Sequence, residues 1–179
     1  MSNLTTHVVV GYDFTASARE ALLRAIKLAA RAPFHVLHFV CALAPGASAD
    51  DTYESIADIV GQELRNAQIA DQVHFFVHAR FGRPADEILA VAREVGADLI
   101  IVGTKGLTGV ERMVLGSVAE AVVREAGCAV VIARPRTYPH VELLDIKTVE
   151  PHATHYHQPH RYAYESARVL KRPSDWPLY

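Results

Sequence analysis

The hydrophobic residues of this chain fall into short runs that alternate with amphipathic segments. The first run, His7 to Gly11, is rich in β-branched residues and lacks polar alternation, which predicts a buried strand. After it, apolar positions recur at helical spacing to about Ala32, and Ser17 and Glu20 have the spacing of a capping box. The chain is therefore expected to begin with a strand followed by a helix.

The same alternation continues as far as residue 133. The pattern predicts further strands at residues 34–41, 72–80, 98–102 and 129–133, and further helices at 51–70, 84–95 and 116–126. Buried strands joined by helices indicate a parallel sheet, because parallel neighbours need crossover connections. Residues 1–135 are therefore predicted to form a doubly wound α/β domain with helices on both faces of the sheet.

The composition changes over residues 136–179, which hold five of the nine prolines and five of the ten histidines. Periodicity is weak there, so we expect an extension of the domain rather than more of its sheet. Tyr162 and Tyr164 alternate as in a strand, and one interpretation is an extra hairpin added to a sheet edge. Another is a segment that wraps over the domain or over a partner subunit.

Charge and cysteine content exclude several classes of protein. Eighteen Lys and Arg stand against 20 Asp and Glu, a formal charge of -2, so no field of one sign favours nucleic acid or an anionic membrane. Cys41 and Cys128 are too far apart for a disulfide framework or a four-cysteine zinc site. Neither a signal peptide nor an apolar run of about 20 residues is evident. We expect a cytoplasmic protein that binds neither nucleic acid nor membrane.

A glycine-rich segment follows the fourth expected strand, with Gly103, Gly106 and Gly116 spaced as Gly-x2-Gly-x9-Gly. The first two would allow positive φ angles and a close approach to a ligand. Gly116 and Ser117 stand where a helix begins, and free N–H groups there favour an anion. Lys105 would add a cation beside a phosphate. The alternative interpretation is that these glycines only permit a tight strand-to-helix connection.

An acid, Asp13, stands just beyond the first strand. Ligands of doubly wound sheets bind at the carboxyl ends of strands, so this position favours ligand contact. Asp13 could instead cap the turn that follows. His38 lies in the second expected strand, and we expect it to be a hydrogen-bonded, partly buried histidine rather than a catalytic base.

Together, the strand–helix alternation, the acid after the first strand and the glycine spacing resemble the universal stress protein family over residues 4–134. In that family Gly-x2-Gly-x9-Gly-Ser/Thr is the signature of an ATP-binding branch. The resemblance implies a five-stranded parallel sheet in the order 3-2-1-4-5, of the adenine nucleotide alpha hydrolase-like type, with ATP, accompanied by Mg, between the first strand and the glycine loop. The positions that it assigns to the nucleotide are Gly11, Tyr12, Asp13, Phe39, Val102, Gly103, Lys105, Gly106, Gly116, Ser117, Val118 and Ala119.

The resemblance further implies an ATP-binding stress-response regulator or sensor. A slow Mg-dependent ATP hydrolase is the alternative, although no residue can be assigned as a dedicated base. Tyr12 and Phe39 are larger than the residues usual at their positions and would narrow the adenosine pocket. A homodimer is expected through the strand Ala129 to Ala133, both from the resemblance and because an apolar edge strand tends to pair with another chain.

Four histidines of the extension suggest a further function. His155 and His157 would project from the same face of an extended segment, and His152 or His160 could complete a set of zinc ligands. Against this, Pro151 and Pro159 flank the group as in an irregular loop, where histidines are ordinary polar residues. Metal binding through the extension is therefore a second alternative.

Overall fold

The computed structural model of the chain describes residues 5–31, 35–104, 115–134, 148–149 and 163–164. Contacts divide the chain into two units, Met1–Arg136 and Thr137–Tyr179, and each is considered by itself. None of the helices in these described ranges is long and apolar enough to cross a membrane.

The first unit contains a five-stranded parallel sheet with the order β3-β2-β1-β4-β5. This confirms the fold class and the strand order expected from the sequence. The strands are β1 (Thr6–Gly11), β2 (His35–Leu43), β3 (His74–Phe81), β4 (Leu99–Gly103) and β5 (Ala129–Ala133). The helices are α1 (Ala16–Ala29), α2 (Ala49–Asn66), α3 (Pro84–Val95) and α4 (Ser117–Glu125).

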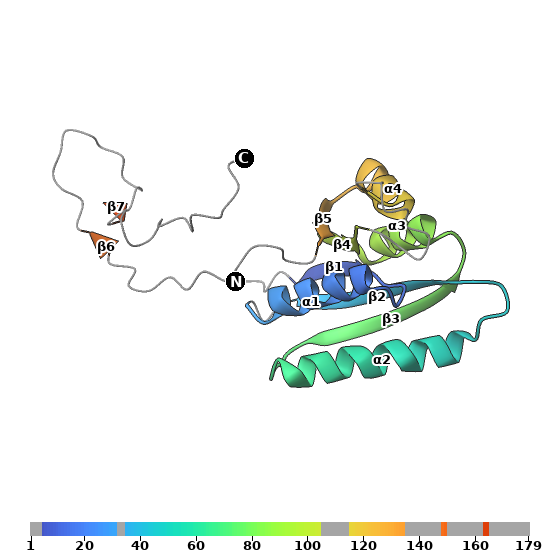
Figure 1. The fold of residues 1–179 in the computed structure, drawn as a ribbon, viewed down its shortest axis with the longest axis horizontal. Helices are drawn as coiled ribbons and strands as arrows, with labels where there is room; N and C mark the ends of the chain where they lie inside the picture. Colours follow the sequence, from blue (N-terminus) through green and yellow to red (C-terminus); the bar gives the residue numbers. More distant parts are fainter. Residues whose placement is uncertain (1–4, 32–34, 105–114, 135–147, 150–162, 165–179) are drawn as a thin grey trace. The chain divides into compact units, whose positions relative to one another are not determined.

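The helices cover both faces of the sheet (Figure 1). The valines of β1 pack against helices on both of these faces. Side chains alternate along a strand, so Val8 and Val10 pack in the cluster formed with α1 and α2, whereas Val9 packs in the cluster formed with α3 and α4. All three valines are fully buried. A strand buried on both faces explains the non-alternating apolar run in its sequence.

The helix ends agree with the sequence signals in two places and differ in one. Pro84 occupies the first turn of α3, and Gly96 ends that helix in the left-handed conformation with φ 62°. The expected capping box at Ser17 and Glu20 is wrong. Helix α1 begins at Ala16, and the hydroxyl of Thr15 caps it by accepting a hydrogen bond from the N–H of Ala18 at 3.1 Å.

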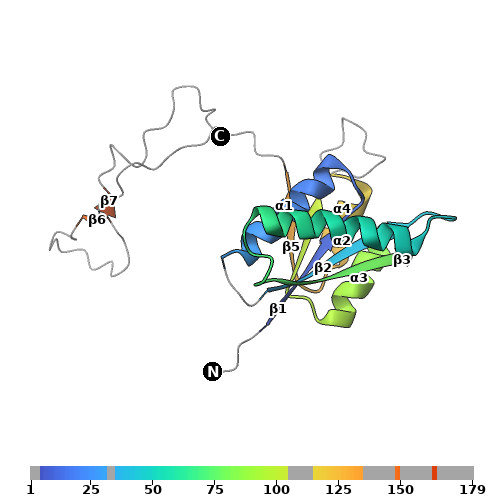
Figure 2. The ribbon, with the colours of Figure 1, turned by 90° about the horizontal axis from the view of Figure 1, so that it is seen from below.

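The strand order places β1 directly between β2 and β4. The chain runs from β1 to β2 and β3 on one side, then crosses to β4 and β5 on the other. Figure 2 shows the sheet behind α1 and α2. The order thus reverses between β1 and β4. A doubly wound sheet binds ligands outside the carboxyl ends of its strands at this point, so the ends at Gly11 and Gly103 define the candidate site.

In the second unit, β6 (Thr148–Val149) and β7 (Ala163–Tyr164) pair as antiparallel strands. A strand is therefore present at Tyr164, as its alternating sequence predicted. The two strands form a two-stranded sheet. Tyr162 lies outside the described residues.

Candidate functional site

The tips of β1 and β4 lie against each other at the reversal point of the strand order. Val10 pairs with Ile101, which brings Gly11 beside Val102. A Cβ atom at Gly11 would lie 2.8 Å from Cδ1 of Ile88 in α3 and 3.1 Å from Cγ1 of Val102. The absence of a side chain at Gly11 therefore lets α3 pack closely on the tip of β1.

A backbone hydrogen bond closes the glycine loop. The N–H of Gly116 donates to the carbonyl oxygen of Thr104 at 2.7 Å, so the residue before α4 is fixed to the end of β4. Lys105 and Gly106 lie in the loop between them, outside the described residues. The bond thus holds the two ends of the loop together.

The start of α4 presents backbone donors at this place. Gly116 is the N-cap residue and contributes no side chain, and its carbonyl oxygen accepts the first intrahelical bond, from the N–H of Glu120 at 2.9 Å. The N–H groups of Ser117, Val118 and Ala119 therefore have no acceptor within the helix. Ser117 is exposed and adds a hydroxyl. This set can donate to an anion such as a phosphate, with the positive end of the helix dipole behind it.

Gly103 has a different role from the expected one. Its φ is not among the positive values of the described glycines, so the expected left-handed turn is wrong. The missing side chain instead makes room for the first turn of α1, since a Cβ atom at Gly103 would lie 2.6 Å from the carbonyl carbon and oxygen of Ser17. The hydroxyls of Ser17 and the buried Thr104 lie 3.2 Å apart at the same junction. The glycine thus joins β4 to α1 by close packing.

Asp13 lies beyond the tip of β1, and its carboxylate organises the turn there. Oδ1 accepts hydrogen bonds from the N–H of Thr15 at 3.1 Å and from its hydroxyl at 2.5 Å. The capping role that the sequence left open is therefore present. In the described part of the chain no hydrogen bond ends on the second carboxylate oxygen, so Asp13 retains an acceptor for a ligand.

Sequence reasoning missed Phe14, the residue between Asp13 and Thr15. Its φ is 62°, an uncommon value for an aromatic residue, and its side chain is half exposed. The ring meets the ring of Tyr12 edge-on, with centroids 5.2 Å apart. Nothing in the sequence around position 14 signals a left-handed conformation, because glycine or asparagine is the usual marker.

The rings of Tyr12 and Phe39 point into the core, not toward the sheet edge. Tyr12 is 6% exposed and Phe39 is fully buried, and both belong to the cluster beneath α1 and α2. Their size is therefore accommodated by the core, and the expectation that they narrow the adenosine pocket finds no support in their placement. The N–H of Tyr12 donates to the carbonyl oxygen of Val40 at 2.9 Å.

Phe39 lies in the middle of its strand because β2 continues to Leu43. It pairs with Val10 on one side and with Val77 on the other. Of the nucleotide positions expected from the sequence, those within the described residues thus cluster at the tips of β1 and β4 and at the start of α4, whereas Phe39 lies further back in the sheet.

The negative charge of Asp13 affects the pKa values of two buried side chains, Tyr12 and Cys41. Burial raises the pKa of the Tyr12 hydroxyl, an effect that Arg19 opposes and Asp13 reinforces. Burial also raises the pKa of the Cys41 thiol, and Asp13 adds to this shift.

The charge of Asp13 also bears on how a ligand would be oriented. A carboxylate repels phosphate, so the phosphate end of a ligand fits the start of α4 better than the vicinity of Asp13.

No group of three or more His, Cys, Asp or Glu side chains in the described ranges has a geometry suited to a metal ion. The predicted zinc ligands His152, His155, His157 and His160 lie outside those ranges. Their role stays a prediction.

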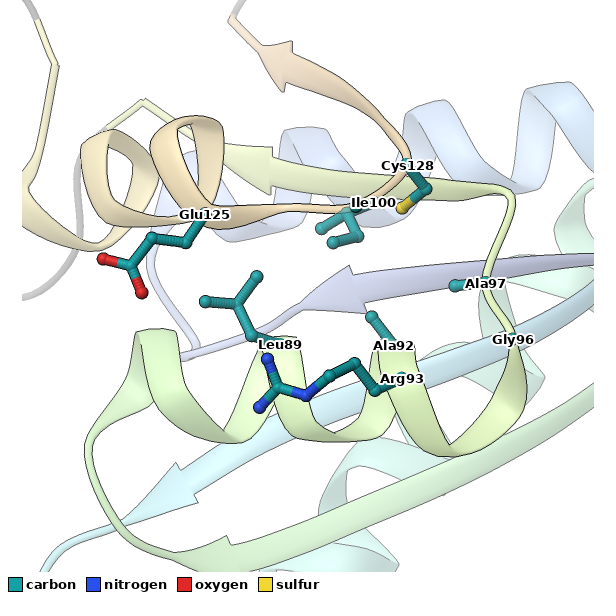
Figure 3. Close-up of a pocket in the computed structure, with 9 residues that line it drawn as sticks. Leu89, Ala92, Arg93, Gly96, Ala97, Ile100, Glu125 and Cys128 are labelled. Carbon is teal, nitrogen blue, oxygen red and sulfur yellow. The ribbon is translucent and has the colours of Figure 1, made fainter.

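A pocket of about 280 Å³ lies elsewhere, between α3 and α4 at the amino ends of β4 and β5 (Figure 3). Leu89 and Ile100 give it an apolar lining, and Arg93, Glu125 and Cys128 contribute polar atoms. No pattern in the sequence indicated this pocket. It lies at the end of the sheet opposite to the candidate site.

The comparisons with known proteins agree with this fold. The family model for the universal stress protein family matches residues 5–134. A universal stress protein of Methanocaldococcus jannaschii is 33% identical over 142 residues, which cover 74% of this chain and 84% of that protein.

Two solved structures share the fold. Universal stress protein UspA from Lactobacillus plantarum superposes with a TM-score of 0.56 at 22% identity, over 73% of this chain and 98% of that one. A universal stress protein in complex with cAMP superposes with a TM-score of 0.55 at 27% identity, over 72% of this chain and 96% of that one.

Proposed function

Since the chain belongs to the universal stress protein family, we propose that it binds an adenine nucleotide at the tips of β1 and β4 and acts as a stress-response regulator or sensor. In this proposal the phosphates lie at the start of α4. The adenosine lies nearer Asp13, where the carboxylate can accept hydrogen bonds from ribose hydroxyls.

The observation that carries the proposal is the hydrogen bond between Thr104 and Gly116. It holds the free N–H groups at the start of α4 beside the carboxyl end of β4, which is the position that a ligand of a doubly wound sheet requires. Ser117, Val118 and Ala119 supply these donors without any rearrangement of the helix. Lys105 and Gly106 would complete the phosphate contacts from the loop.

The identity of the nucleotide rests on the glycine signature and on one relative. The Gly-x2-Gly-x9-Gly-Ser spacing favours ATP, with Mg bound to its phosphates. The solved relative that holds cAMP is 27% identical, and it supports adenine as the base without distinguishing the phosphate chain. ATP is therefore the first ligand to test, with cAMP and AMP as competitors.

A binding role suits the described residues better than rapid turnover. Hydrolysis needs a positioned water, usually through a base, and charge neutralisation. Asp13 is engaged by Thr15 through one oxygen, and Ser117 is an exposed hydroxyl beside the phosphate donors. The slow Mg-dependent ATP hydrolase remains the alternative, and Mg-dependent phosphate release that Ser117→Ala abolishes would favour it.

Equilibrium titration of the full chain with ATP tests the proposal. Gly116→Val places a branched side chain beside the phosphate donors, in a backbone conformation with φ -74° and ψ 155° that valine readily adopts. Gly127→Val is the matched control, because nothing lies within 4 Å of a Cβ atom at Gly127, just beyond the other end of α4. We expect binding by the wild type and by Gly127→Val, and loss of binding by Gly116→Val. A wild type that binds no adenine nucleotide would overturn the proposal.

The assembly that we propose is a homodimer through β5. Within the first unit this strand lies at one edge of the sheet, next to β4, and Val131 on it is 40% exposed. Val131→Lys would add a charge to this edge without disturbing the core. We expect the wild type to sediment as a dimer and the variant as a monomer, and a wild-type monomer would contradict the proposed assembly.

A further inference from the structure

Three histidines on neighbouring strands are joined by two contacts between ring nitrogens. Nδ1 of His7 on β1 lies 3.0 Å from Nε2 of His38 on β2. Nδ1 of His38 lies 3.2 Å from Nε2 of His78 on β3. We call these three residues the histidine row. It takes no part in the proposed nucleotide site.

The register of the sheet explains how the row forms. His38 pairs with Val9 on β1 and with Phe76 on β3. His7 lies two residues before Val9, and His78 lies two residues after Phe76, so all three imidazoles occupy one face along a diagonal across the strands. It is the face on which Val9 packs with α3.

The middle member is shielded from solvent. His38 is only 5% exposed, and the ring of Phe76 stacks on its ring with centroids 5.3 Å apart and an angle of 12° between the planes. Phe76 itself is 55% exposed. The outer members, His7 and His78, are less buried than His38, so protons can reach the row from its ends.

The number of protons that the row can bind with both contacts intact follows from the chemistry of imidazole. A neutral imidazole has one N–H group and one bare nitrogen, and each contact in the row needs one proton between its two nitrogens. Three neutral rings fill both contacts and leave their remaining proton on one outer nitrogen. One additional proton can occupy the other outer nitrogen with both contacts kept. Any further proton puts N–H groups on both sides of one contact and breaks it.

Charged side chains lie near both outer histidines of the row. Near His78, Arg80 of the same strand forms a two-pronged ion pair with Glu94 of α3, with N–O distances of 2.7 and 2.6 Å. Burial lowers the pKa of His78, with Arg80 adding to this shift and Glu94 opposing it. The exposed His74 is the remaining titratable residue on this face of β3.

At the other end of the row, the carboxylate of Asp98 accepts a hydrogen bond from the backbone N–H of His7 at 2.9 Å. In the middle, burial and then the neighbouring His78 and His7 lower the pKa of His38 to about 4. An additional proton is therefore disfavoured on His38, the buried middle ring.

We propose that the histidine row binds protons as one unit, and that its two contacts hold β1, β2 and β3 together until acid breaks one of them. On acidification it takes up a single proton with both contacts kept. A second proton breaks a contact and loosens the three strands from one another.

Nitrogen NMR of the imidazoles tests this in the full chain between about pH 8 and pH 4. We expect scalar couplings across both N–H···N contacts at neutral pH, and uptake of a single proton by the row before a coupling is lost. In His38→Leu, which removes both contacts, the couplings and the shared uptake of one proton should be lost. Wild-type rings that show no coupling and titrate as they do in His38→Leu would overturn the proposal.

Two further variants test the proposal even if His38→Leu fails to fold. Phe76→Ala removes the exposed ring that shields His38, so His38 should titrate at a higher pH than in the wild type. His74→Gln, on the same face of β3 but outside the row, should change neither the couplings nor the titration. An unchanged titration of His38 in Phe76→Ala would contradict the shielding of the middle ring on which the proposal depends.

Discussion

The carbonyl oxygen of Thr104 accepts a 2.7 Å hydrogen bond from the N–H of Gly116, which joins the end of β4 to the residue that caps α4. Because of this bond, the start of α4 is fixed to the end of β4. The donors proposed to hold phosphate are therefore preorganised, and ligand binding does not have to fix the helix.

Removing the bond without changing the backbone conformation should weaken nucleotide binding. Gly116→Pro deletes the N–H group, and the φ of -74° already suits proline. We expect the affinity for ATP to fall by about tenfold, the equivalent of one hydrogen bond. Gly116→Ala keeps the N–H group and is the control. Equal ATP affinities for the two variants, measured by calorimetric titration, would show that the bond does not organise the site.

Gly103→Ala should destabilise the fold. The new Cβ atom would lie 2.6 Å from backbone atoms of Ser17, so α1 or β4 must shift. Overpacking of this kind costs about 1–3 kcal/mol in the free energy of unfolding. Gly127→Ala meets nothing within 4 Å and should leave stability nearly unchanged. Urea denaturation of both variants measures the difference, and equal stabilities would refute the close packing of β4 on α1.

Thr15→Ala should lower the free energy of unfolding by about 1 kcal/mol, because the hydroxyl caps α1 through the N–H of Ala18. The same hydroxyl donates to Asp13, so the variant should also loosen the turn that carries the carboxylate. Thr15→Ser keeps both bonds and should retain most of the stability. Thermal unfolding of the three proteins provides the comparison. If Thr15→Ser is as unstable as Thr15→Ala, the hydroxyl is not the cap.

Acid should destabilise the protein through His38. The pKa of His38 in the fold, about 4, is below the ordinary value of 6.5, so the unfolded chain binds a proton more readily. This contribution to stability is complete above about pH 6.5 and is lost as the pH falls through 4, with a total of up to about 3 kcal/mol. His38→Leu should flatten the pH dependence over this interval. Urea denaturation across the range tests it, and equal slopes for the two proteins would rule out His38 as the source.

The alternation of buried strands and helices was enough to predict the architecture, because each element carries its own signal. The non-alternating valines of β1 indicate a strand covered on both faces, and Pro84 and Gly96 mark the two ends of α3. Element ends were harder to predict. Thr15 and Ser17 are both acceptable caps in sequence, and only the packing of the first turn of α1 against Gly103 shows which one serves.

The site was predicted in part. Glycine spacing located the start of α4, since a helix N-terminus after a strand has a local signature. The role of Gly103 could not be predicted, because the spacing cannot distinguish a glycine that approaches a ligand from one that approaches a helix. The histidine row depends on the register of three strands that are distant in sequence, and no local pattern reveals it.

Amide NMR of the 15N-labelled full chain during titration with ATP and Mg tests the central claim most directly, because it reports where the nucleotide binds. The account predicts saturable shifts at Asp13, Gly116, Val118 and Ala119. Residues of the pocket between α3 and α4, such as Arg93 and Cys128, should shift little. Shifts confined to that pocket, or none at any ATP concentration, would contradict a nucleotide site at the tips of β1 and β4.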